Sequence, residues 1–554
     1  MVIRRRAGLL ATLALLLIPA VAAAATFEVG PGHDYETIGE VPWEALEAGD
    51  TVLIHWRAQP YHEKWIVAAH GTEDQPVTVQ GVAGPDGQLP VIDGRDATTR
   101  EELNYWGDSR SIIKIGGSNQ PNIDRPTHII IDGLEIAHAH QDYSFTGRSG
   151  LTDYTGHAAA IFVETGDHIT IRNCVLRGSG NGLFVANQTT NILIEHNHLF
   201  DNGNDGSIYE HNSYTEADHI TFQFNHFGPL CDGCRGNNLK DRSANTVIRY
   251  NWINGGNRTL DLVDSSSLHD REGYDETHVY GNVLIEPQSP GNRQIIHYGG
   301  DSSDENNYRK GTLYFHHNTV VSTREERTTL IRLSTNDERA VMTNNVVYVE
   351  SGGQNLSYVD SSGILELSHN WFSETPVDTF SSLSGEIHDD GTNLFDDDPG
   401  FVDISAEDFH LREDSPLRNA AVHGDDAPTP EFQYIVHQGG EPRPHADPAD
   451  IGAFGYCDES CQDPEPGGDA GPGGDIDAGS DIGLDSDTDP NVDAGFESDA
   501  GFEGDADPGT EDQGRCSLLS PGQPPMGTLL LFVAAWLMIR RGNPGSSRFA
   551  RMLP

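Results

Sequence analysis

Residues 168–200 read HITIRNCVLRGSGNGLFVANQTTNILIEHNHLF, and within them one short pattern occurs twice. In each copy, apolar residues alternate with polar ones, and the run ends at an asparagine, first Asn173 and then Asn197. Alternation with a period of two is typical of a β-strand that buries one face. The stretch therefore predicts short strands that recur once per structural unit.

The same pattern continues along the chain at unequal intervals. Counted from Asn173, successive asparagines are 24, 28, 26, 31, 36, 27 and 25 residues apart. A constant pattern with insertions of variable length is typical of a solenoid whose loops project from one corner. We expect the asparagines to form a structural ladder, each bonding to its neighbours along the stack. They are Asn173, Asn197, Asn225, Asn251, Asn282, Asn318, Asn345 and Asn370, with Asp132 in the equivalent place.

These repeats resemble the right-handed parallel β-helix of pectate-lyase-like proteins, over residues 26–456. Residues 26–55, TFEVGPGHDYETIGEVPWEALEAGDTVLIH, are similar to the opening of that fold, where a short amphipathic helix covers the first strand edge. Residues 398–421, DPGFVDISAEDFHLREDSPLRNAA, are similar to its closing segment. The resemblance implies an all-β solenoid with an N-terminal capping helix near Val41–Ala48.

The composition argues against several classes of partner. The 554 residues include 34 Lys and Arg and 86 Asp and Glu, which gives a net charge of −52. Proteins that bind nucleic acid or an anionic membrane surface need a basic face, so neither partner is expected. The 61 glycines suit a turn-rich β protein better than a helical bundle. We expect the protein to be a monomer.

The N-terminus is predicted to be an export signal. Residues 1–25 contain the basic cluster Arg4–Arg6, an apolar run from Leu9 to Ile18 and the small residues Ala22–Ala25. This order is typical of a secretory signal peptide. Export makes disulfides possible and argues against a cytosolic enzyme.

The C-terminus is predicted to be a stalk followed by a sorting segment. Residues 457–515 contain no Lys or Arg between Asp458 and Gly514, and we expect a disordered acidic linker there. Residues 516–541 then contain Cys516, an apolar run Leu529–Ile539 and two arginines. This order resembles the cell-surface sorting tails of myxobacteria and related predatory bacteria, in which the cysteine is the anchoring point. A single-pass tail anchor is the alternative.

We therefore expect an exported protein. It is either released outside the cell or held at the cell surface or outer membrane, with the membrane reached only through the tail at residues 516–541. The tail's apolar run has 11 residues, too few to span a bilayer comfortably but enough for a transient sorting helix.

The chemistry is predicted on three strands that align by their apolar positions. If Ile208, Leu239 and Leu260 point inward, Tyr209, Lys240 and Asp261 form one outward ladder. His211 and Arg242 then form the next row. Alternation also places Arg249 on the strand before Asn251, and Arg258 begins the following coil.

The segments around these strands are similar to bacterial β-helix proteins that degrade polysaccharides. The Lys-x-Arg of residues 240–242 resembles the lysine and arginine pair of alginate-lyase-like β-helix families. The resemblance implies a polysaccharide substrate and a catalytic pair of Lys240 and Arg242. The residues expected to bind the substrate around this pair are Tyr209, His211, Arg249 and Arg258.

Elimination from a uronic acid explains why such residues are needed. The reaction removes a proton alpha to a carboxylate, so it requires a base and a cation that neutralises the carboxylate. Arg242 and Arg258 are expected to lower the pKa of Lys240, while nearby Asp residues raise it. A Ca²⁺ ion would resolve that conflict, because Ca²⁺ takes oxygen ligands. Its expected ligands are Glu210, Asp241, Asp261 and Asp264.

The cysteines predict local bridges rather than a scaffold. Cys231 and Cys234 are expected to form a disulfide that braces the loop before Asn237, since zinc would need a second pair. Cys457 and Cys461 are a second candidate pair. Cys174 lies within a repeat and is expected to be buried.

Three functions remain open on these grounds. The first is a surface-displayed lyase that cleaves a uronic-acid polysaccharide. The second is a non-catalytic carbohydrate-binding or adhesive β-helix. The third is a glycoside hydrolase with Asp261 and Asp264 as paired carboxylates, which is disfavoured because a three-residue separation on a strand turns the two side chains to opposite faces.

Overall fold

The computed structural model describes residues 24–288, 292–423, 428–444 and 446–457, which all belong to one compact unit. Residues 1–23 of the predicted signal peptide, the acidic linker beyond Cys457 and the sorting tail lie outside the described residues, so those interpretations remain predictions. Within the described residues, no helix is long and apolar enough to cross a bilayer.

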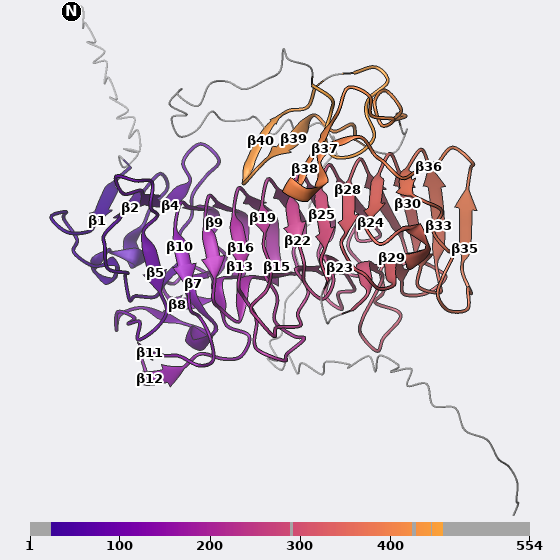
Figure 1. Ribbon diagram of the computed structural model, residues 1–554. Helices are drawn as coiled ribbons and strands as arrows, with labels where there is room; N and C mark the ends of the chain where they lie inside the picture. Colours follow the sequence, from indigo (N-terminus) through magenta and orange to yellow (C-terminus); the bar gives the residue numbers. More distant parts are fainter. Residues whose placement is uncertain (1–23, 289–291, 424–427, 445, 458–554) are drawn as a thin grey trace, which may run out of the picture. The chain divides into compact units, whose positions relative to one another are not determined.

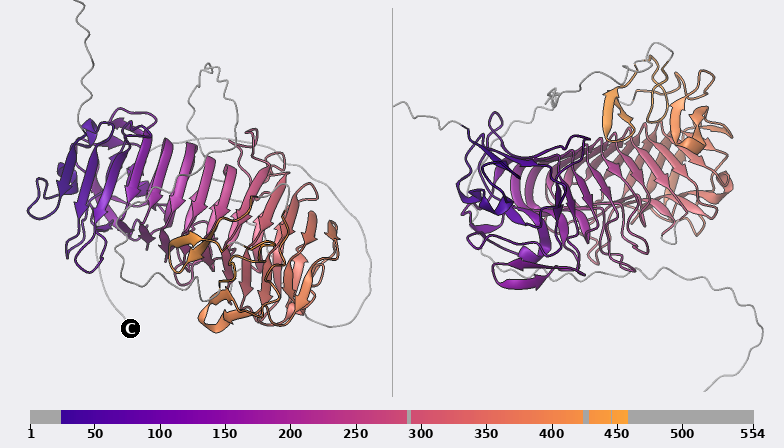
Figure 2. Two further views of the ribbon diagram at one scale, coloured as in Figure 1. Left: turned by 90° about the horizontal axis from the view of Figure 1, so that it is seen from above. Right: turned by 60° about the vertical axis from the view of Figure 1, so that its left-hand side comes forward.

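The described chain forms a parallel β-helix, as the repeat predicted. Successive coils contribute short strands to three parallel faces, which we call the first, second and third faces. Figure 1 and the two views of Figure 2 show the strands of successive coils running side by side. One coil runs from β17 (Ser213–Thr215) on the second face, through β18 (Asp218–Gln223) on the first, to β19 (His226–Phe227) on the third.

Among the described residues, the first face contains thirteen strands in parallel register. The longest two, β13 (Ala159–Arg172) and β15 (Asn181–Glu195), bend and also take part in the second face. The other strands of the first face are β1 Thr26–Val29, β2 Thr51–His55, β4 Val77–Val82, β9 Thr127–Asp132, β18, β21 Ala244–Arg249, β24 Glu276–Tyr280, β27 Thr312–His316, β30 Arg339–Thr343, β33 Ile364–Ser368 and β35 Glu386–Asp389.

The second and third faces are built in the same way. The second face consists of β3 Trp65–Val67, β7 Ser111–Ile115, the first halves of β13 and β15, β17, β20 Leu239–Asp241, β23 Leu260–Leu262, β26 Gln294–Tyr298, β29 Thr328–Leu333 and β32 Leu356–Val359. The third face consists of β5 Val91–Asp93, β10 Glu135–Ala137, β14 Val175–Arg177, β16 His198–Phe200, β19, β22 Trp252–Asn254, β25 Val283–Glu286, β28 Thr319–Ser322, β31 Val346–Val349, β34 Trp371–Ser373 and β36 Leu394–Asp396.

The remaining elements lie outside these faces. In the described residues, four antiparallel pairs join β6 Asn104–Tyr105 with β8 Ser118–Gln120, β11 Ser144–Gly147 with β12 Gly150–Asp153, β37 Phe401–Asp403 with β38 Asp408–Leu411, and β39 Phe432–Ile435 with β40 Gly439–Pro442. The 3-10 turns are η1 Ile38–Glu40, η2 Trp43–Ala45, η3 Asp108–Arg110, η4 Gly353–Asn355 and η5 Ile404–Ala406.

The core lies between the three faces and consists of stacked apolar side chains. Ile169 is opposite Ile192 on the next coil, which in turn is opposite Ile220, and all three are buried. Burying an isoleucine of this kind contributes about 1.5–3 kcal/mol. The alternation read from residues 168–200 therefore identifies the inward side chains correctly.

The asparagine ladder exists, but its register differs at the first position. From Asn225 to Asn370 each asparagine accepts hydrogen bonds at Oδ1 from the backbone and side-chain amides of the preceding one, and Asn393 extends the row. Asn173 is not part of it. Cys174 takes the ladder position, where its backbone N–H donates to Asn197 Oδ1 at 3.0 Å.

Asn173 has a different role that the spacing concealed. It adopts a left-handed conformation with φ of 52° and donates to Asp132 Oδ1 at 2.8 Å. The later coils place His196, Phe224 or Tyr250 at this turn position, directly before the ladder asparagine. Asparagine tolerates left-handed backbone better than most residues, so it recurs at both positions and the two are confused in sequence.

The expected short N-terminal helix is present as the 3-10 helix η2, within Val41–Ala48, and a second 3-10 helix, η1, precedes it. Pro42 holds the preceding residue Val41 in an extended conformation, with ψ of 135°, so no helix can continue through it. Ile38 of η1 and Trp43 of η2 are both buried in the core. Trp43 donates from Nε1 to the carbonyl of Ile38 at 2.8 Å and stacks on Trp65.

The C-terminal residues pack against the third face. Phe409 and Tyr434 contact Trp252 of β22, with ring centroids 5.5 and 5.9 Å away. Cys231 and Cys234 are joined in a disulfide and Cys174 is free and buried, as expected. Cys457 is disulfide-bonded, and its expected partner Cys461 lies outside the described residues.

We predict that Asn251→Ala in the full-length chain lowers the free energy of unfolding. Asn251 accepts from the backbone and side-chain amides of Asn225 and donates to the carbonyl of Phe222 at 3.0 Å, all within the buried ladder. Each buried group left unpaired costs about 1–3 kcal/mol. Denaturant unfolding measures the loss. The matched control Asn173→Gly removes an exposed asparagine from a left-handed turn and should cost far less; equal losses would contradict a special role for the ladder.

Candidate functional site

A register-aligned row of outward side chains follows the second face. It is aromatic at Phe162, Phe184 and Tyr214, and becomes ionic from Lys240 onward. Lys240 lies opposite Asp261, as the sequence alignment of the two strands predicted. In full, the row contains Lys114, Phe162, Phe184, Tyr214, Lys240, Asp261, His297 and Arg332.

The prediction that Tyr209 belongs to this row is wrong. Lys240 is opposite Tyr214, because β17 begins at Ser213, and Tyr209 lies in the preceding loop with 46% of its surface exposed. Ile208, which was expected to point inward, is 42% exposed. The alternation of residues 207–211 thus imitates a strand without forming one.

Lys240 stands at the centre of an ionic cluster. Its Nζ lies 2.6 Å from Asp261 Oδ2 and 2.5 Å from Asp301 Oδ2, and only 8% of its side chain is exposed. Burial acts to lower the pKa of Lys240, but the charges of Asp261 and Asp301 outweigh it, so the pKa lies above its ordinary value. Burial acts to raise the pKa of Asp301, but the charges of Lys240 and Arg242 outweigh it, so this pKa lies below its usual range.

Arg242 is held on three sides. It donates from Nε to Tyr214 Oη at 2.7 Å and from Nη2 to Asp301 Oδ1 at 2.6 Å, and its Nη1 also donates to the backbone carbonyl of Asp264. The Asp301 carboxylate therefore bridges the two cations, with one oxygen on Arg242 and the other on Lys240. Its side chain is 30% exposed, more than any other member of this group.

A chain of hydrogen bonds positions the carboxylates of Asp261 and Asp301. His297 contacts Asp261 Oδ1 at 2.8 Å through Nδ1 and Ser334 Oγ at 2.9 Å through Nε2. Ser334 in turn accepts the backbone N–H of Gly300 at 2.8 Å, next to Asp301. Burial lowers the pKa of His297 to about 4, so the ring is neutral near pH 7. His297 thus positions Asp261 and, through Ser334, the loop that carries Asp301.

Two of the expected substrate-binding residues adjoin the cluster. Arg258 lies 3.5 Å from Asp261 Oδ1 and donates to Gln294 Oε1. His211 is buried, and its Nδ1 accepts the backbone N–H of Asn237 at 2.9 Å. Burial lowers the pKa of His211 to about 3, so this histidine is also neutral.

Two other expected site residues lie elsewhere. Arg249 is on β21 of the first face, where it donates to Gln223 Oε1 and Tyr280 Oη, away from the row of the second face. Asp241 follows Lys240 and therefore points to the interior, where it is fully buried and faces Arg309 at 3.4 Å. Alternation along β20 turns the side chain of Asp241 away from that of Lys240.

The four carboxylates expected to hold Ca²⁺ do not gather at one point. Asp264 accepts the backbone amides of Asp301 and Ser302, and Glu210 contacts His157 at 2.9 Å. Asp261 is surrounded by donors from Lys240, Asn237 and His297. Hydrogen-bond donors around a carboxylate suit an ion-pair network, because they occupy the oxygens that a Ca²⁺ ion would need. We therefore derive no chemistry from Ca²⁺, and the calcium expectation stays a prediction.

Sequence reasoning missed three groups at this site: Asp301, Tyr214 and His297. Asp301 lies in a loop between strands, where no alternation assigns a direction. One signal was present, since Asp301 follows Gly299–Gly300 directly after a strand. Gly299 has φ of 129°, and a Cβ there would lie 2.6 Å from Ser334 Oγ, so the glycine permits the loop to turn against Ser334.

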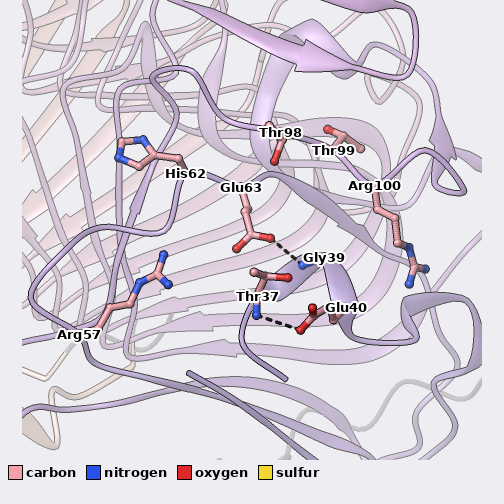
Figure 3. Close-up of a pocket in the computed structure, with 9 residues that line it drawn as sticks. All are labelled: Thr37, Gly39, Glu40, Arg57, His62, Glu63, Thr98, Thr99 and Arg100. Atoms are coloured by element: carbon pink, nitrogen blue, oxygen red, sulfur yellow. Dashed lines mark hydrogen bonds between the residues drawn. The ribbon is translucent and has the colours of Figure 1, made fainter. Parts of the chain in front are cut away.

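A separate hollow of about 610 Å³ lies near the N-terminal turns, lined by residues of three coils (Figure 3). Its acidic side chain Glu63 accepts the backbone amides of Ile38 and Gly39 at 3.0 and 2.8 Å. Arg57 stacks on Tyr61, and Arg100 pairs with Glu44. These side chains brace the first coils, and we assign the hollow no chemistry.

No family model and no curated protein matches the chain. Among solved structures, it is similar to pectate lyase Pel9A, with a TM-score of 0.44 and 11% identity over 79% of this chain and 98% of that one. It is similar to an alginate lyase from Paenibacillus sp. str. FPU-7, with a TM-score of 0.40 and 11% identity over 62% and 99%. A GH136 lacto-N-biosidase from Eubacterium ramulus gives 0.37 and 12% over 67% and 68%. Similarity at this level carries no argument about activity, which has to come from the site.

Proposed function

We propose that this chain degrades a uronic-acid polysaccharide by β-elimination at the cluster around Lys240 and Arg242. The observation that carries the proposal is the bridging carboxylate of Asp301. Asp301 contacts Arg242 through one carboxylate oxygen and Lys240 through the other. If the carboxylate of a uronic acid replaced Asp301 on Arg242, the α-carbon of that sugar would lie beside Lys240. Asp301 is on a loop and partly exposed, so it is the member of the cluster best able to give way.

Arg242 is the neutralising cation in this scheme. As the proton leaves the α-carbon, negative charge moves onto the substrate carboxylate, and a fixed guanidinium stabilises that charge. Tyr214 and the Asp264 carbonyl hold Arg242 in place independently of Asp301, so its position is kept when Asp301 moves. An arginine stays charged at any physiological pH.

Lys240 is the base, and the acidic side chains around it make the rate depend on pH. Only the neutral amine removes a proton, and the raised pKa keeps most of the lysine protonated near neutrality. Loss of the Asp301 contact removes one of the two charges that raise this pKa. The leaving oxygen needs a proton as well, and Lys240 can return to it the proton that it takes from the α-carbon.

Carbohydrate binding without turnover is the second candidate. It is favoured by the same ion pairs, since a Lys240 that stays protonated between two carboxylates binds anions but removes no proton. A hydrolase receives no support, because Asp264 caps a loop rather than facing Asp261. Asp261 and Asp301 both pair with Lys240, but the pKa of each carboxyl is lowered, so neither is an acid at neutral pH.

An assay on purified full-length protein with a panel of polyuronates tests the proposal. We expect unsaturated, UV-absorbing products from at least one polymer. Below its pKa, the neutral fraction of a lysine rises tenfold per pH unit, so kcat/KM should climb between about pH 7 and pH 10. Binding to a polyuronate without product at any pH would replace the lyase by the adhesive function. A rate that peaks near pH 7 would show that Lys240 is not the base.

A further inference from the structure

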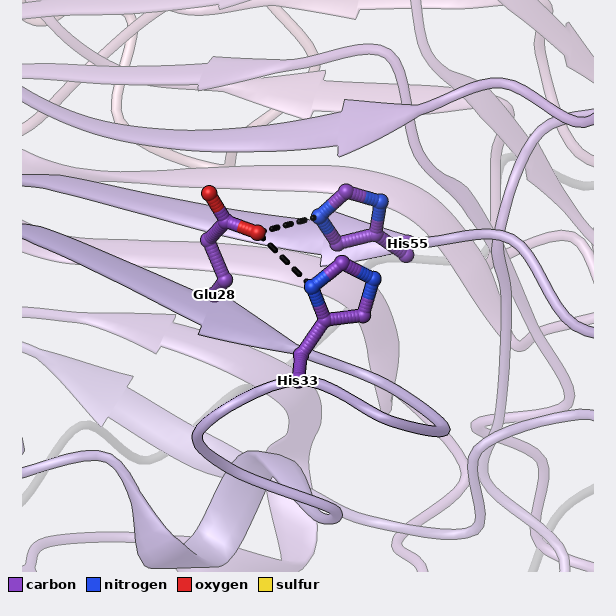
Figure 4. Close-up of side chains that lie close together, drawn as sticks. All are labelled: Glu28, His33 and His55. Atoms are coloured by element: carbon purple, nitrogen blue, oxygen red, sulfur yellow. Dashed lines mark hydrogen bonds and ion pairs between the residues drawn. The ribbon is translucent and has the colours of Figure 1, made fainter.

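Three metal-ligating side chains converge on the first two coils, away from the cluster around Lys240. Glu28 comes from β1, His33 from the turn that follows it and His55 from the last position of β2 (Figure 4). Their ligand atoms all lie within 4.8 Å of one another, which no other group of three such side chains achieves in the described part of the chain. None of the three has a role in the proposed elimination.

The contacts within the group centre on one carboxylate oxygen. Glu28 Oε2 lies 2.7 Å from His33 Nδ1 and 3.4 Å from His55 Nε2. The two imidazole rings are stacked, with centroids 3.7 Å apart and planes 12° from parallel. His55 Nε2 is buried and has no hydrogen-bond partner, so one nitrogen aimed at the carboxylate is unsatisfied.

The backbone is built to bring the rings together. The turn is closed by hydrogen bonds from the backbone N–H of Gly30 to the Tyr35 carbonyl and from Tyr35 to the Glu28 carbonyl, at 2.8 and 3.1 Å. Gly30 has φ of 142°, and a Cβ there would lie 3.1 Å from His55 Cβ. A side chain at residue 30 would therefore strain the turn and push His33 away from His55.

The group is open to a cation from outside. Neutral imidazole and ionised carboxylate are the forms that bind transition metals. The side chains are 30%, 23% and 43% exposed at His33, His55 and Glu28, so an ion has access from solvent.

We propose that Glu28, His33 and His55 bind one Zn²⁺ ion. Two histidines and one carboxylate form a ligand set that zinc accepts, with a further position open to water. Binding requires the stacked rings to turn so that both nitrogens face the ion, which the position of His33 on a loop permits. The bound ion would connect the first turn to β2 and close the N-terminal end of the solenoid.

The test is a titration of the full-length protein with Co²⁺, followed by competition with Zn²⁺. Histidine-bound Co²⁺ of low coordination number absorbs visible light strongly, unlike Co²⁺ on scattered aspartates of the acidic chain. We expect one such site per chain, displaced by one equivalent of Zn²⁺. Glu28→Gln and His55→Ala should weaken Zn²⁺ binding more than about 100-fold, since loss of even an outer-sphere partner costs 10–100-fold.

A second stacked histidine pair is the matched control. His128 and His168 stack with centroids 4.5 Å apart, and His168 also contacts a carboxylate, that of Asp167. That group does not gather three ligand atoms, so His168→Ala should leave the cobalt spectrum and the zinc affinity unchanged. Because 43% of the Glu28 side chain is exposed and glutamine has nearly the same shape, Glu28→Gln is expected to fold, and circular dichroism checks it. Absence of the absorption band, or a band that survives in Glu28→Gln and His55→Ala, overturns the proposal.

Discussion

Lys240→Ala is expected to abolish the formation of unsaturated products, with a loss of about 10²–10⁴ in kcat, the range for removal of a general base. Binding of the polyuronate should persist, because Arg242 still holds the carboxylate. Lys240→Arg is the sharper variant. It keeps the positive charge between Asp261 and Asp301 but cannot act as a base near neutral pH. A base therefore predicts equal losses in Lys240→Ala and Lys240→Arg, whereas a purely electrostatic role predicts that arginine restores activity.

Two further variants locate the chemistry on the second face. Arg242→Ala should lose nearly as much activity as Lys240→Ala, because the charge on the substrate carboxylate is no longer neutralised. Arg249→Ala should retain activity, since Arg249 lies on the first face with Gln223 and Tyr280.

Asp301→Asn tests whether the substrate carboxylate displaces Asp301 from Arg242. An asparagine competes for Arg242 less strongly than a carboxylate does, so KM should fall. Loss of kcat in Asp301→Asn with KM unchanged would contradict the idea that substrate replaces Asp301.

Asp241→Ala is expected to destabilise the fold by about 3–5 kcal/mol, the cost of breaking a buried ion pair by removing one partner. Asp241 and Arg309 both have fully buried side chains. Asp241 also accepts from Thr215 Oγ1 at 2.7 Å and Thr246 Oγ1 at 2.8 Å, which would lose their acceptor. Denaturant unfolding of the full-length chain measures the loss.

The same variant separates a structural role from a calcium role. A ligand of Ca²⁺ predicts stability and activity that depend on added Ca²⁺, whereas the interior ion pair predicts a loss that Ca²⁺ does not change. Asp337→Ala is the control, because Asp337 forms an exposed pair with Lys310 that is worth roughly 0–1 kcal/mol. A small effect of Asp241→Ala, or its rescue by Ca²⁺, would return Asp241 to the list of metal ligands.

The repeat in the sequence was sufficient to predict the solenoid. Apolar alternation decides which side chains face inward, because a strand has a period of two whatever surrounds it. It correctly predicted the pairing of Lys240 with Asp261, where both residues follow a buried leucine on short, regular strands. The ladder asparagines from Asn197 onward were predictable for the same reason, since each occupies one position of a repeated unit.

Two errors arose where a local pattern had more than one structural explanation. Asn173 and Asn197 both end an apolar run, but Cys174 holds the ladder position and Asn173 the left-handed turn. Residues 207–211 alternate like a strand, yet the strand that pairs with β20 begins at Ser213. Propensity alone cannot separate these cases, because the deciding hydrogen bonds are made to the neighbouring coil.

The sequence by itself determined the class of fold, the inward residues of the regular strands and the presence of a lysine and an arginine on one outward face. Only the tertiary structure decided what surrounds them. Asp301 reaches Lys240 from a later coil, 61 residues along the chain, on a loop without alternation. His297 and Ser334, 57 and 94 residues along the chain, position Asp261 and the loop of Asp301 around it. The period of a strand predicts which way each side chain points within its own coil. The partners of a charged side chain also depend on the loops of neighbouring coils, and only the stacking of the coils decides which loops lie beside it.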